Sequence, residues 1–176
     1  MGKSCLILGE IEDYITGKTI KDTHDERYRQ KLAHLLVNHK GYQKKEIKAG
    51  HQLLVNVGDK TAVINIDFMV TLSGRICMII KYGPGSMVTR CRPALAISRL
   101  VSGYQVPVVV VSNGEDAEVV SGSTGKVISN GLDSIPSKPE LLEIAGHADF
   151  ISISEKQAMM EARIVYAFEI DGSCSI

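Results

Sequence analysis

The sequence predicts an α/β fold with a mixed central sheet flanked by helices, and three observations support this class. Residues 61–81 hold two apolar strand patterns separated by the tight turn Ser73-Gly74. A helical pattern follows, and after it comes Val106–Ser112, a run rich in β-branched residues. Such a run is typical of a strand that is covered on both faces. Strands alternating with a helix in this order indicate an α/β architecture.

The N-terminal part is predicted to form a short hairpin or loop and then a helix. Apolar and polar residues alternate around the turn signal Thr16-Gly17. Thr23, with Glu26 three residues later, has the form of a capping box. Apolar residues then recur at helical spacing until Gly41, so the first helix should cover roughly residues 24–40.

The middle of the chain carries the strands and helix that define the fold class. Strand patterns cover Ile47–Val57, Thr61–Leu72 and Arg75–Lys81. A helix is predicted over Val88–Val101, where Pro93 is tolerable only in the first turn or as a kink.

The C-terminal third should add a closing hairpin and two helices. The hairpin strands are Ala117–Val120 and Lys126–Ile128, and a short helix should run over residues 136–144. Ser154 opens a last helix that ends near residue 168. Its buried stripe is predicted to consist of Met159, Ala162, Val165 and Tyr166.

Composition points to one soluble domain over residues 1–176, with a core over about 22–145 and a C-terminal helix over about 154–169. The 176 residues are 44% hydrophobic and 23% charged, as in ordinary globular proteins. Twenty basic residues balance twenty acidic residues. Dedicated nucleic-acid binders usually carry a positive excess, so any such binding must use a local patch or a partner.

The cysteines and the apolar segments indicate a reduced, cytoplasmic protein. The four cysteines, Cys5, Cys77, Cys91 and Cys174, lie far apart and form no C-x-x-C pair, so a zinc site is not expected. Met1–Leu8 is too short and too polar for a signal peptide. Because no apolar run is long enough to span a bilayer, we expect no membrane association.

Asp67 is the strongest candidate for a functional residue. It lies within the apolar strand pattern INIDFMV, where a buried carboxylate must be paired, hydrogen-bonded or bound to a metal. Mg²⁺ takes carboxylate oxygens and keeps several waters, so Asp67 is a candidate metal ligand. The alternative is an aspartate at a strand end that points to solvent.

Lys81 ends the next strand and could stabilise an attacking hydroxide or a pentavalent phosphate. Alternatively, it is a strand-terminal lysine that faces water. Strand alternation places residues 77, 79 and 81 on one face, so the acid position two residues before Lys81 holds Ile79. If the pattern slides by one residue, Ile80 and Tyr82 take the acid and lysine positions. Either way the second carboxylate is missing.

Four further residues complete the candidate site, and each has a purely structural alternative. Glu26 could be a second metal ligand, although helix capping and the helix dipole explain its position equally. The predicted helix Val88–Val101 carries Arg90, Arg92 and Arg99, which could contact phosphates or form a solvated face.

With these residues in view, the chain resembles the N-terminal nuclease domain of type I restriction enzyme R subunits, in a short stand-alone form without the helicase motor. The matching pieces cover roughly residues 13–145 and include INIDFMV and MIIKYGPGSMVTRCRPALAISRL. The resemblance implies a PD-(D/E)XK, restriction-endonuclease-like core, Mg²⁺ at one end of the sheet and double-stranded DNA as substrate. By position, Asp67 matches the motif aspartate, Glu26 the helix acid and Lys81 the motif lysine, whereas Ile79 departs from the motif acid.

Three functional hypotheses follow. The first is a nuclease-fold protein with little or no cleavage, which acts as a DNA-binding or assembly module, with other restriction-modification subunits as possible partners. The second is an active Mg²⁺-dependent endonuclease that uses Glu26, Asp67 and Lys81. The third is a structural subunit that self-associates through Met159, Met160 and Phe168 of the last helix.

Overall fold

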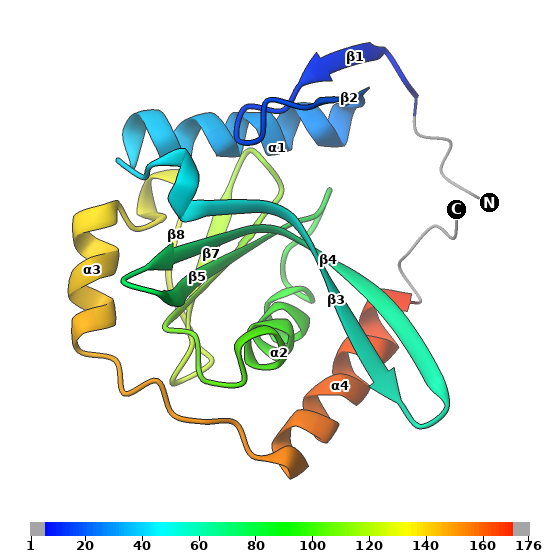
Figure 1. The fold of residues 1–176 in the computed structure, drawn as a ribbon, viewed down its shortest axis with the longest axis vertical. Coiled ribbons are helices and arrows are strands. Elements are labelled where there is room, and N and C mark those ends of the chain that lie inside the picture. Colours follow the sequence, from blue (N-terminus) through cyan, green and yellow to red (C-terminus); the bar gives the residue numbers. More distant parts are fainter. Residues whose placement is uncertain (1–5, 171–176) are drawn as a thin grey trace.

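The structure is a computed structural model and describes residues 6–170. A six-stranded sheet lies at its centre, in the order β3-β4-β5-β6-β7-β8 (Figure 1). Neighbouring strands are antiparallel except β5 and β6, which are parallel. The strands are β3 (Ile47–Val57), β4 (Lys60–Leu72), β5 (Arg75–Tyr82), β6 (Val108–Ser112), β7 (Ala117–Ser121) and β8 (Val127–Asn130).

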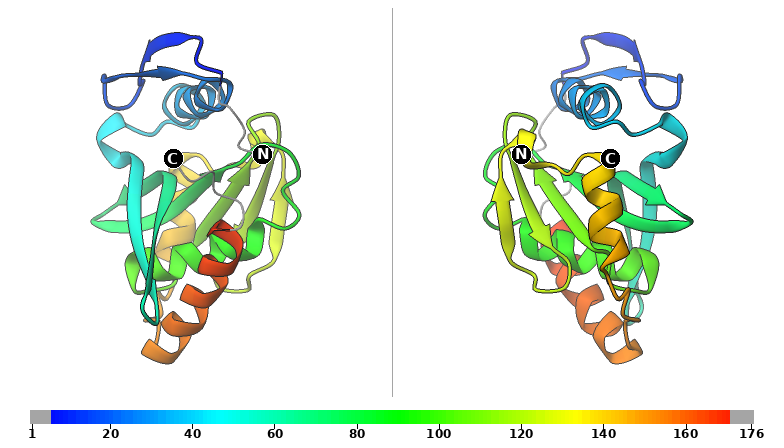
Figure 2. Two further views of the ribbon diagram at one scale, coloured as in Figure 1. Left: turned by 90° about the vertical axis from the view of Figure 1, so that its right-hand side faces the viewer. Right: turned by 90° about the vertical axis from the view of Figure 1, so that its left-hand side faces the viewer.

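Helices cover both faces of this sheet, which confirms the predicted mixed α/β architecture (Figure 2). The helices are α1 (His24–His34), α2 (Cys91–Ser102), α3 (Lys138–Gly146) and α4 (Glu155–Ile170). Side chains of α1 and α3 pack in one buried cluster, and side chains of α2 and α4 pack in the other. The parallel pair β5–β6 is joined through α2, as a parallel crossover requires.

A two-stranded ribbon precedes α1, as the sequence predicts. Its strands are β1 (Gly9–Glu12) and β2 (Thr19–Asp22), and they pair antiparallel around the predicted turn. Figure 1 shows the ribbon beside α1. The hydroxyl of Thr23 accepts a hydrogen bond from the backbone N–H of Glu26, so half of the predicted capping box is present. The side chain of Glu26 has other hydrogen-bond partners, described below.

Several predicted boundaries shift by a few residues. The first helix is α-helical only to His34 and continues as a π-helical turn, η1 (Leu35–His39). Helix α2 begins at Cys91 rather than at residue 88, so Pro93 stands in its first turn, where no donor is lost to the helix. Short 3₁₀ turns occur at η2 (Lys44–Glu46) and η3 (Leu132–Ser134).

The buried stripe predicted for the last helix is only partly correct. Ala162 and Val165 are buried against α2 and the sheet, and Tyr166 is half-buried. Met159 is 55% exposed, so its place in the predicted stripe was wrong. The helix meets α2 over a narrow stripe that leaves Met159 on its open side.

Along strand β4, the side chains at every second position switch from one face of the sheet to the other at Asp67. Before this residue Ile66 packs with α2 and α4, and after it Phe68 packs with α1 and α3. In a regular strand residues 66 and 68 would share a face, so the strand is irregular here. On the neighbouring strand Gly50 interrupts the pairing with a φ of 63°, a conformation that favours glycine.

Strand β5 also departs from the alternation predicted for residues 77, 79 and 81. Cys77 packs with α1 and α3, whereas Ile79 packs with α2 and α4. The cause is a register irregularity: Val70 pairs with Met78 and Thr71 with Ile76, so Cys77 is an extra residue in β5. In the part of the chain described here, no helix is long and apolar enough to cross a membrane.

Candidate functional site

Asp67 is buried, with 8% of its surface exposed, and both of its carboxylate oxygens accept hydrogen bonds. Oδ1 accepts from Nε of Arg29 at 2.6 Å, and Oδ2 accepts from the backbone N–H of Tyr82 at 2.7 Å. The first partner comes from α1 and the second from the end of β5. A charged carboxylate can remain in this apolar strand because both oxygens are satisfied.

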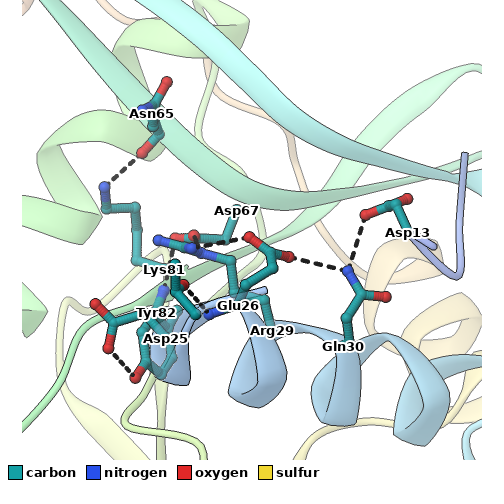
Figure 3. A network of polar contacts seen from close by, with 10 residues as sticks. Asp13, Asp25, Glu26, Arg29, Gln30, Asn65, Asp67, Lys81 and Tyr82 are labelled. Atoms are coloured by element: carbon teal, nitrogen blue, oxygen red, sulfur yellow. Dashed lines mark hydrogen bonds and ion pairs between the residues drawn. The ribbon is translucent and has the colours of Figure 1, made fainter. Parts of the chain in front are cut away.

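Arg29 also binds the second candidate acid. Its Nη1 lies 3.1 Å from Oε2 of Glu26, one helical turn earlier on α1. Figure 3 shows the guanidinium between the carboxylates of Glu26 and Asp67. The same guanidinium lies over the ring of Tyr82, with 5.2 Å between its central carbon and the ring centroid.

The electrostatics of Arg29 reflect this position. Burial lowers the pKa of the guanidinium, but the nearby charges of Asp67 and Glu26, with their hydrogen bonds, raise this pKa by more. The net shift is upward, so Arg29 is a permanent cation at this site.

A second side chain of α1 extends the network to the β1–β2 ribbon. Nε2 of Gln30 donates to Oε1 of Glu26 at 2.9 Å and to Oδ2 of Asp13 at 3.0 Å (Figure 3). Burial raises the pKa of Asp13, but the hydrogen bonds from Thr16, Gln30 and Ile15 lower this pKa by a larger amount. The net shift is therefore downward. Both oxygens of Glu26 are therefore engaged, one by Arg29 and one by Gln30.

These acids line one pocket between the β1–β2 ribbon, α1 and the bend of β3 and β4. Its volume is about 380 Å³, which lies within the range of ligand pockets. Polar side chains of the β1–β2 ribbon, α1 and β4 face it, and Ala49 and Gly50 of β3 form part of its wall. The charged residues that line it are Asp13, Lys18, Glu26, Arg29 and Asp67.

Lys81 does not line this pocket. It is half-buried, and its Nζ donates to the backbone carbonyl oxygen of Asn65, toward which its side chain extends in Figure 3. It lines a separate hollow of about 50 Å³, together with Tyr82, Arg90, Ala94 and Val111. The structure therefore brings Glu26 and Asp67 together through Arg29 and places Lys81 elsewhere.

The two positions at which an acid could accompany a lysine are both in the core. Ile79 and Ile80 are each 0% exposed, the first packed with α2 and α4 and the second with α1 and α3. Asp25, next to Glu26, accepts a hydrogen bond from the hydroxyl of Tyr82 at 3.0 Å. Burial and this contact raise the pKa of the Tyr82 phenol well above its usual range.

The three arginines proposed as phosphate contacts make contacts within the domain. Arg92 and Arg99 of α2 both form ion pairs with Glu161, a buried acid of α4. Arg90 donates to the backbone carbonyl oxygens of Pro84 and Ser86, so it holds the turn after β5. Two of the three guanidinium groups therefore share one carboxylate where α2 meets α4.

Comparison with known proteins decides the family. The model for the type I restriction enzyme R protein N terminus matches residues 24–136, from the start of α1 to just beyond η3. The chain belongs to this family. The matched range includes Glu26, Asp67, Ile79, Lys81 and the arginines of α2. Neither a comparison with curated proteins nor one with solved structures found a match.

The side chains of Glu26 and Asp67, as they are placed here, do not fit the Mg²⁺ ion that the resemblance implies. Mg²⁺ needs carboxylate oxygens that can face the metal in octahedral geometry. All four carboxylate oxygens of Glu26 and Asp67 already accept hydrogen bonds from protein groups, and a guanidinium lies between the two acids. Within residues 6–170, no group of three or more metal-ligating side chains is placed to hold a metal.

Sequence reasoning missed Arg29, Gln30 and Asp13, which complete the network. Arg29 and Gln30 stand three and four residues after Glu26, and this spacing places them on the same helical surface. Asp13 gives no such signal, because the ribbon reaches α1 only through tertiary packing.

A basic segment also went unnoticed, because the total charge of the chain is zero. Residues 31–51 contain five lysines and three histidines but a single acid, Glu46. Lys44, Lys45 and Lys48 are exposed where this segment approaches the pocket. A count of charge in a moving window would have found it.

Proposed function

We propose that this domain is a DNA-binding module of the PD-(D/E)XK type that has kept the fold and lost hydrolysis. The observation that carries this proposal is the state of Asp67, whose two oxygens are held by Arg29 and by the backbone of Tyr82. A metal-dependent nuclease needs this carboxylate to face a metal.

The other parts of a cleavage site support the same conclusion. The motif acid is replaced by Ile79, a core residue that cannot be exchanged for a carboxylate without burying a charge. The Nζ of Lys81 donates to the backbone carbonyl oxygen of Asn65, so this lysine is engaged with the main chain of β4. Within residues 6–170, the motif acid position is therefore filled by a core isoleucine, and the motif lysine binds the main chain of β4.

Binding of double-stranded DNA is supported by the family and by the basic segment. Phosphate contacts depend on exposed lysines and arginines, whatever the base sequence. Lys44, Lys45 and Lys48 are exposed, and Lys48 directly precedes Ala49 and Gly50, which line the pocket. We place the DNA backbone along these three lysines rather than along the arginines of α2.

Fluorescence anisotropy with a labelled duplex tests this surface. Replacing Lys44, Lys45 and Lys48 by Gln should weaken binding at least about tenfold and lower the slope of log affinity against log salt by roughly 3. The matched control replaces Lys126, Lys156 and Arg163 by Gln, which removes three exposed charges from the turn before β8 and from α4. Equal losses in the two variants would rule out this interface.

A plasmid-nicking assay with Mg²⁺ or Mn²⁺ tests the loss of hydrolysis. We expect supercoiled DNA to stay intact with the wild type. Nicking that Asp67→Ala abolishes would instead establish the alternative function, an active Mg²⁺-dependent endonuclease.

An assembly role is the second candidate function, and exposed apolar side chains on α4 favour it. Met159, Met160 and Phe168 are each more than half exposed. Met and aromatic side chains are enriched at protein interfaces. Light scattering should show a concentration-dependent mass that Met160→Lys lowers, if α4 joins two copies of the chain. A monomer at all concentrations would exclude self-association.

A further inference from the structure

Arg29 lies between Glu26 and Asp67, the two acids that the resemblance would make metal ligands. Its guanidinium contacts Asp67 on one side and Glu26 on the other, and it is 34% exposed. We infer that Arg29 is the resident cation of this site and takes the electrostatic place of the divalent ion. Glu26 and Asp67 then form a divalent-cation site only when this guanidinium is removed.

The contacts of Arg29 show why it can serve as a resident cation. It reaches the two acids through different nitrogens, Nε and Nη1, in the fixed fork that suits carboxylates. It is also held from the side by the ring of Tyr82, whose backbone N–H occupies the other oxygen of Asp67. One rigid cation thus joins α1, β4 and the end of β5.

The charges that line the pocket support the inference independently. Among the described residues that line it, three are acids, Asp13, Glu26 and Asp67, and the other cation is Lys18 of the β1–β2 loop. Gln30 lies between Asp13 and Glu26 as a neutral donor, so the positive charge between the acids comes from Arg29. Without Arg29 the pocket would hold three acids and one lysine. Such a pocket attracts a cation or takes up a proton.

The inference concerns the same site as the proposed function and rests on it, because a domain that cleaves DNA with Mg²⁺ would need the metal near Arg29. The inference about Arg29 and the proposed loss of hydrolysis can nevertheless fail separately. Nicking tests hydrolysis in the wild type, whereas metal binding by variants tests Arg29.

The experiment measures the melting temperature with and without Mn²⁺, and the paramagnetic resonance spectrum of Mn²⁺, for the wild type and three variants. Arg29→Gln removes the charge, and Arg29→Lys keeps it. The double variant Arg29→Gln with Asp67→Asn also removes one metal ligand. Circular dichroism first establishes that each variant is folded.

For Arg29→Gln we expect a lower melting temperature without metal and a rise of about 3–5 °C with Mn²⁺ at around ten times its dissociation constant. The wild type, Arg29→Lys and the double variant should show no such rise.

Two results would overturn the inference. One is a folded Arg29→Gln variant whose melting temperature and resonance spectrum do not respond to Mn²⁺. The other needs no Arg29 variant: Mn²⁺ binding by the wild type that Asp67→Asn abolishes would show that the guanidinium does not replace the metal. If Arg29→Gln did not respond to Mn²⁺ and the wild type left the plasmid intact, the proposed function would stand and only this inference would fail.

Discussion

Ile79 pairs with Met69 across the antiparallel strands β5 and β4, and both side chains are buried on the α2–α4 face of the sheet. This pairing places the residue at the motif acid position in the core. The carboxylate of Asp67, by contrast, binds Arg29 of α1. The two positions that a nuclease would bring to one metal therefore have different surroundings here.

Ile79→Glu should not restore cleavage and should destabilise the domain by more than about 4 kcal/mol, because it buries an unpaired carboxylate. Urea unfolding and plasmid nicking check both parts. Val63→Glu is the matched control, since Val63 is exposed on β4 and its change should cost less than about 0.5 kcal/mol. A stable, metal-dependent Ile79→Glu nuclease would contradict our account of the site.

Asp67→Ala should lower the free energy of unfolding by about 2–3 kcal/mol, because it leaves Nε of Arg29 and the backbone N–H of Tyr82 without their acceptor. Urea denaturation measures the loss. Asp59→Ala, at the exposed turn between β3 and β4, is the control and should be nearly neutral. Equal effects would mean that the network does not stabilise the fold.

The network at Asp13 should weaken in acid. Hydrogen bonds lower the pKa of its carboxyl from 3.8 in spite of burial, so the ionised form is favoured by folding. Its contribution is complete well above pH 3.8 and disappears as the pH falls through the lower, folded-state pKa. The difference in unfolding free energy between the wild type and Asp13→Asn should therefore shrink in that range. A difference that stays constant with pH would contradict this assignment.

Two glycines should differ in their tolerance of alanine. At Gly122 an added Cβ would lie 1.8 Å from the backbone oxygen of Val106, so the main chain must move. At Gly83 it would lie 1.5 Å from Nη1 of Arg90, the tip of a flexible side chain that can turn away. Gly122→Ala should cost about 2–4 kcal/mol and Gly83→Ala less than about 1 kcal/mol, as measured by urea unfolding. The reverse order would show that the Arg90 contacts matter more than expected.

Local patterns were sufficient for most of the secondary structure. Strand β3 has the predicted bounds, Ile47–Val57, and β4 and β5 differ from the prediction by one residue each. These elements are encoded by the spacing of apolar residues and by turns such as Ser73-Gly74, which depend on neighbours in the chain. The missing acid at Ile79 was equally visible, because it needs only a count of residues.

Local patterns were not sufficient where packing between distant segments overrides alternation. The change of face at Asp67 depends on Gly50 in the neighbouring strand, and the exposure of Met159 depends on where α4 meets α2. No pattern within one strand or one helix records these contacts.

The partners of the candidate acids also come from distant segments. A strand pattern could show that Asp67 needs a partner, since a buried charge is costly, but it could not name Arg29, 38 residues earlier in the chain. A strand pattern likewise could not predict where the side chain of Lys81 points relative to Asp67. The direction of a side chain at the end of a strand depends here on the irregular pairing of β4 and β5. Burial demands a partner for each charge, and the folded arrangement of α1, β4 and β5 selects which residue provides it.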